Sequence, residues 1–113
     1  MKKGAIVLTT FPFTDFSSVK RRPAIIISFE NEGKKDVIIA FISSVVQTNL
    51  TPTDLLLSED ESNFMETGLH KTSVIKFDKI MTIEKDLLTG EIGKLPAKLL
   101  PEMDKKLKMV FGL

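Results

Sequence analysis

Three cations directly before a proline are the first residues in this chain whose spacing suggests chemistry. Lys20, Arg21 and Arg22 precede Pro23, and Ala24–Ile27 is a continuous apolar run. Such a run is typical of a strand buried on both faces, and the proline restricts Arg22 to an extended conformation. An arginine held this way suits a phosphate, because its planar guanidinium can donate two parallel hydrogen bonds. The alternative is a solvated charge cluster at a strand end.

Two further groups of polar residues could also do chemistry. Ser43 and Ser44 follow the apolar run 36–42, and a core strand would hold their hydroxyl groups rigidly. The alternative is that these serines only satisfy the end of that strand. Further on, Lys76 and Asp78 fall on one face of an alternating strand. A face that carries both charges borders solvent or a pocket.

An aromatic loop separates the first two predicted strands. Ala5–Leu8 predicts the first strand, and Phe11–Ser18 combines a proline, small polar residues and aromatic side chains. Phe11 and Phe13 either stack on nucleobases or cap the core. We expect Pro23 at the first position of the second strand, because a proline cannot donate to a hydrogen-bond ladder.

Short strands continue through the chain, and residues 73–83 predict either two strands or one strand bent at Asp78. They cover residues 36–42, 54–57, 73–83 and 90–94. Ser58–Glu61 has the spacing of a capped helix start, which predicts a short helix to about Met65. An apolar stripe through Phe111 predicts a closing helix that begins near Pro101. These elements favour a small, curved antiparallel sheet or barrel.

Composition narrows the class of protein. The 113 residues should form one domain, with 27% charged and 42% apolar residues as in ordinary soluble proteins. The net charge of +1 excludes the overall basic field of a nucleic-acid coat, so an anion site must be a local patch. The sequence has no cysteine, which excludes disulfides and thiolate metal sites, and one histidine, His70, argues against a zinc centre. The apolar stretch behind Lys2 and Lys3 is too short for a signal peptide or a membrane span, so we expect a cytoplasmic protein.

Several short segments, taken in order, make the chain resemble the MazF/PemK family, the endoribonuclease toxins of type II toxin–antitoxin systems. The segments are Lys3–Val7, Phe11–Asp15, Lys20–Ala24, Ala40–Ser44, Gly68–Leu69, Ser73–Ile75, Asp78–Lys85, Ile92–Leu95 and Gly112–Leu113. The resemblance runs nearly end to end. It implies a mainly β fold with a C-terminal α-helix, a small SH3-like antiparallel barrel of the CcdB/PemK kind, over residues 1–113.

The resemblance also implies an activity and its residues. The activity is sequence-specific cleavage of single-stranded RNA, mostly mRNA, without a metal or cofactor, by a homodimer that a cognate antitoxin inhibits. The family's arginine before the proline matches Arg22, and its hydroxyl residue, commonly threonine, matches Ser43. An Arg-x-Asp pair of another branch matches Lys76 and Asp78, with lysine in place of arginine. The first-loop histidine of that branch has no counterpart, since His70 lies elsewhere.

The four matched residues are the expected catalytic residues. Arg22 would bind the scissile phosphate, and Ser43 would hydrogen-bond a phosphate oxygen. Asp78 would act as general base or orient Lys76. The expected RNA-binding residues are Phe11, Phe13, Thr14, Asp15, Lys20, Arg21, Ser44 and Gln47. Two alternatives stay open: a CcdB-like toxin that acts on DNA gyrase through protein contacts, and a decayed barrel without activity.

Overall fold

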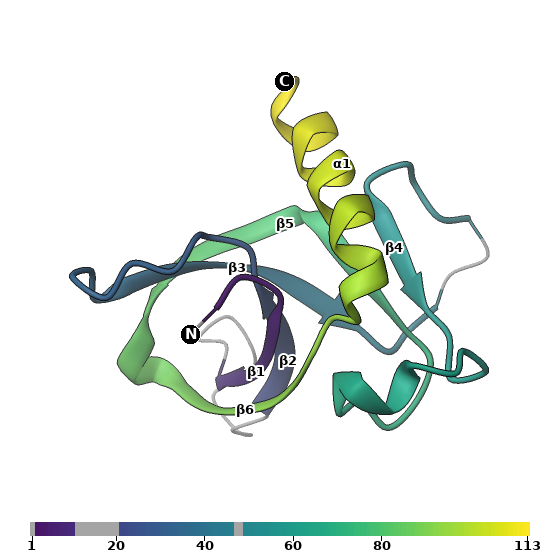
Figure 1. The fold of residues 1–113 in the computed structure, drawn as a ribbon, viewed down its shortest axis with the longest axis horizontal. Coiled ribbons are helices and arrows are strands. Elements are labelled where there is room, and N and C mark those ends of the chain that lie inside the picture. Colours follow the sequence, from purple (N-terminus) through teal and green to yellow (C-terminus); the bar gives the residue numbers. More distant parts are fainter. Residues whose placement is uncertain (1, 11–20, 47–48) are drawn as a thin grey trace.

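A curved antiparallel sheet carries most of the chain (Figure 1). The computed structural model describes residues 2–10, 21–46 and 49–113. The described strands are β1 (Ala5–Thr10), β2 (Arg21–Ile26), β3 (Asp36–Ser43), β4 (Asp54–Leu57), β5 (Ser73–Glu84) and β6 (Leu88–Lys94). The described helices are the short 3-10 helices η1 (Phe64–Thr67), η2 (Lys85–Leu87) and η3 (Ala97–Leu99), and the α-helix α1 (Leu100–Phe111).

The strand order β4-β5-β3-β2-β1-β6 leaves β4 and β6 as the two edges of the sheet. The expected class, mainly β with a C-terminal helix, is confirmed. Among the described strands, however, no ladder joins β4 to β6, so the hydrogen-bonded sheet is not a closed barrel. The backbone of η1 lies against β6 instead: a Cβ on Gly93 would stand 2.3 Å from the carbonyl carbon of Thr67.

The central strands bury side chains on both faces, as the continuous apolar run Ala24–Ile27 predicts. One cluster, here called the helix-side core, contains Ile6, Ile25, Ala40, Ile42, Ile75, Phe77 and Met103. The other, here called the opposite core, contains Val7, Ala24, Ile26, Val37, Ile39 and Ile83. Because successive residues of a strand alternate between the faces, these strands need apolar residues at every position.

Pro23 is the third residue of β2, so the prediction that it opens the strand is wrong. It stands opposite Leu8 of β1, whereas the described pairing of β2 with β3 begins only at Ala24. On the β3 side the proline therefore interrupts no ladder bond of the described pairing. This end position explains why a proline is tolerated inside the strand.

The bend expected at Asp78 is confirmed within one continuous strand, β5. Ala40 of β3 pairs with Ile80, but the next residue, Phe41, pairs with Lys76. The residues between these two pairs have no partner in β3, which is the arrangement that bends a strand and strengthens its twist. Asp78 lies in this irregularity and is exposed.

The predicted helix from Ser58 to Met65 is wrong. The Ser58 hydroxyl accepts a hydrogen bond of 3.2 Å from the Asp60 N–H, which closes a turn rather than capping a helix. The 3-10 helix η1 begins later, at Phe64, and ends before Gly68. The small strand expected near residues 90–94 is longer than predicted, since β6 begins at Leu88.

The closing helix α1 begins at Leu100, with Pro101 in its first turn as predicted. It contacts β5, and its residue Met103 is fully buried in the helix-side core. Phe111 departs from the predicted apolar stripe, because 56% of it is exposed. Figure 1 shows the reason: the C-terminal end of α1 projects beyond the sheet. No described helix combines the length and the apolar character that crossing a bilayer requires.

We predict that Gly93→Ala lowers the free energy of unfolding by about 1–3 kcal/mol, the usual cost of overpacking. The new methyl group would meet backbone atoms of Glu66 and Thr67 within 2.4 Å, and backbone cannot move aside as a flexible side chain can. Urea denaturation followed by circular dichroism measures the change. Gly33→Ala is the control, since its Cβ would lie at an ordinary 3.5 Å from Asn31 Oδ1. Equal stability of the two variants would contradict the close packing of η1 on β6.

Candidate active site

The sheet brings Arg22 and Ser43 to the same end of neighbouring strands. β2 and β3 pair in a register that ends with Ala24 opposite Phe41, and continuing it two residues beyond this last described pair sets Arg22 opposite Ser43. Directly opposed residues of an antiparallel pair point to one face, with Cβ atoms about 5 Å apart. By the alternation of strand residues, both side chains point to the same face of the sheet as the residues of the opposite core. The register therefore gathers the predicted guanidinium and hydroxyl groups on one face, here called the site face.

Lys76 lies on the site face as well, on the next strand of the sheet. It pairs with Phe41 of β3 on one side and with Asp54 of β4 on the other. Ser43 pairs with Val74, two residues before Lys76 on β5. The lysine is therefore a diagonal neighbour of Ser43, a separation that a long side chain can span.

Unlike the other three predicted catalytic residues, Asp78 has no described cross-strand partner. It lies in the irregular part of β5, where no residue of β3 stands opposite, and its side chain is exposed. Across the described parts of the chain, no hydrogen bond or ion pair involves the side chain of Arg22, Lys76 or Asp78. These three charged groups are therefore not neutralised by one another or by described neighbours.

The Ser43 hydroxyl already takes part in a local turn. It accepts a hydrogen bond of 3.1 Å from the Val45 N–H and lies 3.5 Å from the Val45 carbonyl oxygen. This contact is the strand-end role that the sequence left as an alternative. A hydroxyl has one donor hydrogen and two acceptor lone pairs, so the turn still allows donation to an incoming anion.

The predicted RNA-binding residues divide into two groups. Arg21 and Ser44 are described and exposed, and Arg21 alternates to the face away from Arg22. The other predicted residues lie outside the described residues: Phe11, Phe13, Thr14, Asp15, Lys20 and Gln47. Their contribution to the site stays a prediction.

Two residues on the site face were missed by the sequence reasoning. Asp54 stands opposite Lys76 and is only 6% exposed, and its carboxylate accepts a 3.0 Å hydrogen bond from the Thr51 N–H. Leu56 stands opposite Val74, in the same cross-strand row as Ser43. The sequence predicts a strand at Asp54–Leu57. Which of its side chains point to the site face follows only from its pairing with β5.

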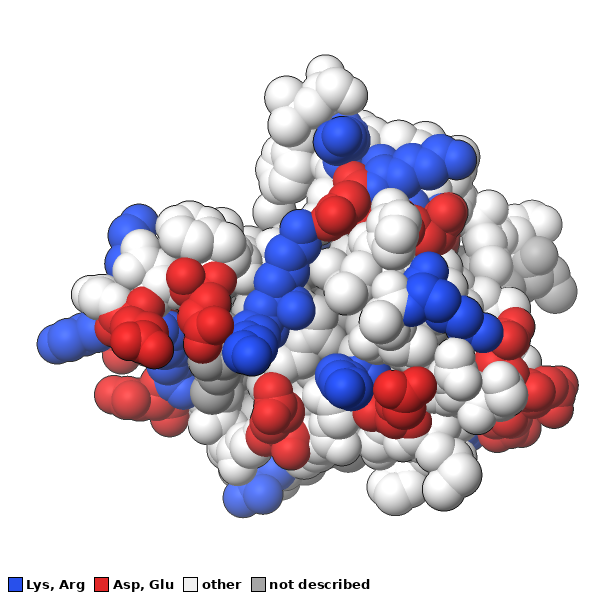
Figure 2. Space-filling view, viewed as in Figure 1, with Lys and Arg blue, Asp and Glu red and all other residues white. Residues whose placement is uncertain are grey.

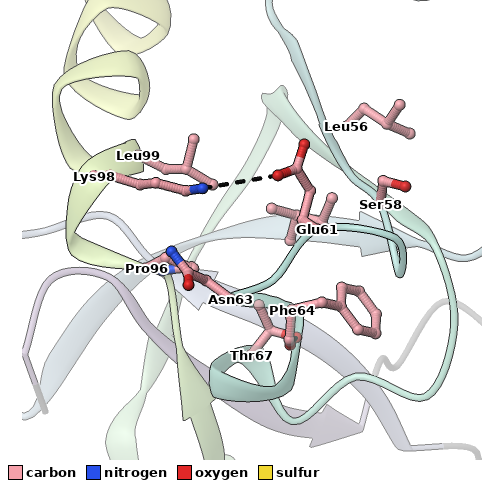
Figure 3. Close-up of a pocket in the computed structure, with 10 residues that line it drawn as sticks. Leu56, Ser58, Glu61, Asn63, Phe64, Thr67, Pro96, Lys98 and Leu99 are labelled. Atoms are coloured by element: carbon pink, nitrogen blue, oxygen red, sulfur yellow. Dashed lines mark hydrogen bonds and ion pairs between the residues drawn. The ribbon is translucent and has the colours of Figure 1, made fainter.

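A cavity of about 110 Å³ lies away from the predicted site, between β4, η1 and η3 (Figure 3). Leu57, Phe64 and Leu99 give it an apolar lining, and Glu61 faces Lys98 across it with 3.7 Å between carboxylate and ammonium. None of the four predicted catalytic residues lines this cavity. Leu56, which stands on the site face, also borders this cavity, so the cavity and the site face adjoin at β4.

Charges of both signs alternate over the face of the molecule shown in Figure 2. On this face Lys and Arg side chains lie beside Asp and Glu side chains, and the net charge of the chain is +1. Such a surface creates no broad positive field. An anion would therefore be held by a few placed groups, such as those on the site face.

Comparison with known proteins confirms the resemblance. The family described as "PemK-like, MazF-like toxin of type II toxin-antitoxin system" matches residues 2–111. "Endoribonuclease MazF2" of Mycobacterium bovis and "Endoribonuclease MazF6" of Mycobacterium tuberculosis are each 31% identical over 97 residues, which cover 83% of this chain and 81% of the relative. A mycobacterial endoribonuclease solved in complex with its cognate antitoxin shares the fold, with a TM-score of 0.77, 18% identity, and coverage of 100% of this chain and 96% of that one.

The family match spans nearly the whole chain, and the shared fold supports it independently. The chain belongs to the PemK-like, MazF-like toxins of type II toxin–antitoxin systems.

Proposed function

We propose that this MazF-family endoribonuclease toxin cuts single-stranded RNA, chiefly mRNA, at specific sequences and without a metal ion. The observation that supports the proposal is the β2–β3 register, which sets Arg22 opposite Ser43 when it is continued two residues beyond its last described pair. A guanidinium and a hydroxyl at that spacing suit a single phosphate group. Residues 1–113 act as one domain, in the cytoplasm where mRNA is translated.

RNA supplies its own nucleophile for this reaction, the 2′-hydroxyl beside the scissile phosphate. The 2′-oxygen forms a bond to phosphorus as the bond to the 5′-oxygen breaks, which leaves a 2′,3′-cyclic phosphate and a 5′-hydroxyl end. The protein must accept the 2′-hydroxyl proton, stabilise the charge on the phosphorane and provide a proton to the 5′-oxygen. Positioned side chains can do all three, so no step requires a metal.

Arg22 and Ser43 hold the phosphate in this proposal. The Arg22 guanidinium donates two hydrogen bonds to the non-bridging oxygens and stabilises the charge that develops there. The Ser43 hydroxyl turns from the Val45 carbonyl oxygen, 3.5 Å away, to donate a shorter bond to a phosphate oxygen. Serine keeps the hydroxyl of the family's usual threonine but lacks the methyl group that restricts its rotamer.

Lys76 and Asp78 supply charge and proton transfer. Lys76 brings a second cation to the face, although a lysine lacks the fork of the arginine found in the matching family pair. Asp78 takes the proton of the 2′-hydroxyl or holds Lys76 in place. Asp78 is exposed, which supports a role in which its carboxylate contacts bound RNA and not another protein side chain.

Nucleotides on either side of the cut are bound by the segments 11–21 and 44–47 in this proposal. Phe11 and Phe13 stack on flanking bases, as single-stranded RNA is usually bound. Thr14, Asp15, Lys20, Arg21, Ser44 and Gln47 complete the contacts in this proposal.

The toxin acts as a homodimer and is inhibited by a cognate antitoxin, an acidic and partly disordered chain that folds as it covers the basic loop. Met109, Phe111 and Leu113 support a protein contact, because all three are exposed apolar side chains at one end of α1. The gyrase-binding alternative is not favoured, since the matched relatives are named as endoribonucleases.

We predict that Arg22→Ala lowers the cleavage rate of labelled single-stranded RNA about 10²–10³-fold in EDTA, the usual loss when a transition-state donor is removed. Arg22→Lys should retain part of the activity, because it keeps the charge without the fork. Lys105→Ala is the control, since Lys105 is an exposed cation of α1. Undiminished cleavage by Arg22→Ala would reject the role of Arg22, and loss of wild-type cleavage in EDTA would reject the metal-free mechanism.

Asp78→Asn should lower the rate about 10²–10⁴-fold if Asp78 is the general base. If it only orients Lys76, then Asp78→Asn, Lys76→Ala and the double variant should lose the same factor. Single-turnover rates measure both cases, with Asp86→Asn on the exposed η2 as the control. A rate for Asp78→Asn equal to that of the control would show that Asp78 takes no part in cleavage.

A further inference from the structure

We infer that Leu56 forms a base-binding subsite next to the cleaved phosphate, an inference that rests on the proposed function. Ser43 of β3 stands opposite Val74 of β5, and Val74 stands opposite Leu56 of β4. Opposed residues of antiparallel strands share a face, so Leu56 belongs to the site face. Two strand spacings, about 10 Å, separate it from Ser43. A nucleotide joined to a phosphate at Ser43 can place its base there.

Leu56 is an exposed apolar residue on the edge strand β4. It is 41% exposed, whereas its strand neighbour Leu57 is 3% exposed in the helix-side core. Figure 3 shows the side chain of Leu56 pointing away from the other cavity residues drawn there. The leucine therefore contributes little to the core, and a ligand on the site face can contact its exposed apolar surface.

Two further exposed apolar residues lie next to the predicted catalytic Ser43 in the chain. Val45 and Val46 follow directly after the predicted catalytic strand end and are 70% and 43% exposed. The hydrogen bond from the Val45 N–H to the Ser43 hydroxyl fixes the start of this segment beside the site. The two valines therefore lie at the Ser43 end of the cross-strand row, and Leu56 lies at its other end, which is the reason to assign them to the same substrate.

The chemistry of the surface indicates what it selects. Leu56, Val45 and Val46 present no hydrogen-bonding side-chain groups, so they can contact the flat face of a base but cannot read its edge. Every base has such a face, and a larger ring system buries more apolar surface. The subsite therefore contributes affinity and a preference for base size at one position beside the cut.

The test pairs Leu56→Thr with RNA that lacks one base. Threonine keeps the strand-forming tendency of the position and removes most of the apolar surface. The cleavage position is first mapped with wild type. Abasic nucleotides then replace, one at a time, the nucleotides on either side of it, and single-turnover cleavage is measured for each substrate. Leu56 is aliphatic and contributes apolar burial, so loss of a base that buries roughly 50 Å² against it should weaken binding about 8-fold at about 25 cal/mol per Å². Leu87→Thr is the matched control, because Leu87 is an exposed leucine on η2, 51% exposed, and lies outside the site face.

The inference predicts one abasic position that slows wild type and Leu87→Thr by this factor. Leu56→Thr should be slower than wild type on intact RNA and should lose nothing further at that position. Equal sensitivity of Leu56→Thr and wild type at every position would overturn the inference. So would unchanged cleavage combined with weaker antitoxin binding, because Leu56 would then serve a protein partner. If wild type cuts no RNA, the proposed function fails first, and the subsite fails with it.

Discussion

The pairing register of β2 with β3 is the constraint on which the proposed site depends. Successive side chains of a strand point to opposite faces, so a slip of one residue would turn Arg22 away from Ser43. The same slip would move the strand's isoleucines between the helix-side core and the opposite core. The proposed alignment of Arg22 with Ser43 and the packing of the two cores therefore depend on one strand register.

Contacts at the far end of this strand pair help to hold the register. The Ile27 N–H donates to the Ile38 carbonyl oxygen at 2.9 Å, and the Ile38 N–H donates to the Ser28 hydroxyl at 3.1 Å. In the connecting turn, Asn31 accepts hydrogen bonds from Gly33 and from the ammonium group of Lys85. The turn and the strand pairing thus favour the same register. The alignment of Arg22 with Ser43 therefore needs no direct contact between the two side chains.

Features that depend on local pattern could be predicted from the sequence, and features that depend on distant partners could not. The continuous run Ala24–Ile27 identified a strand buried on both faces, and the apolar stripe located α1. The helix predicted at Ser58 failed because its hydroxyl closes a turn instead. The exposure of Phe111 could not be predicted, because nothing local shows how far α1 extends beyond the sheet. Leu56 was missed for a related reason: its face is set by pairing with β5, residues distant in sequence.

The claim that Arg22 and Ser43 act on one phosphate can be tested most directly by a double-mutant cycle. Single-turnover RNA cleavage would be measured for wild type, Arg22→Ala, Ser43→Ala and the double variant. Groups that hold the same atom act as a unit, so the double variant should be impaired clearly less than the product of the single losses, by a coupling of about 0.5–3 kcal/mol. Losses that multiply without coupling would show that the two residues act at separate places, and would contradict the proposed site.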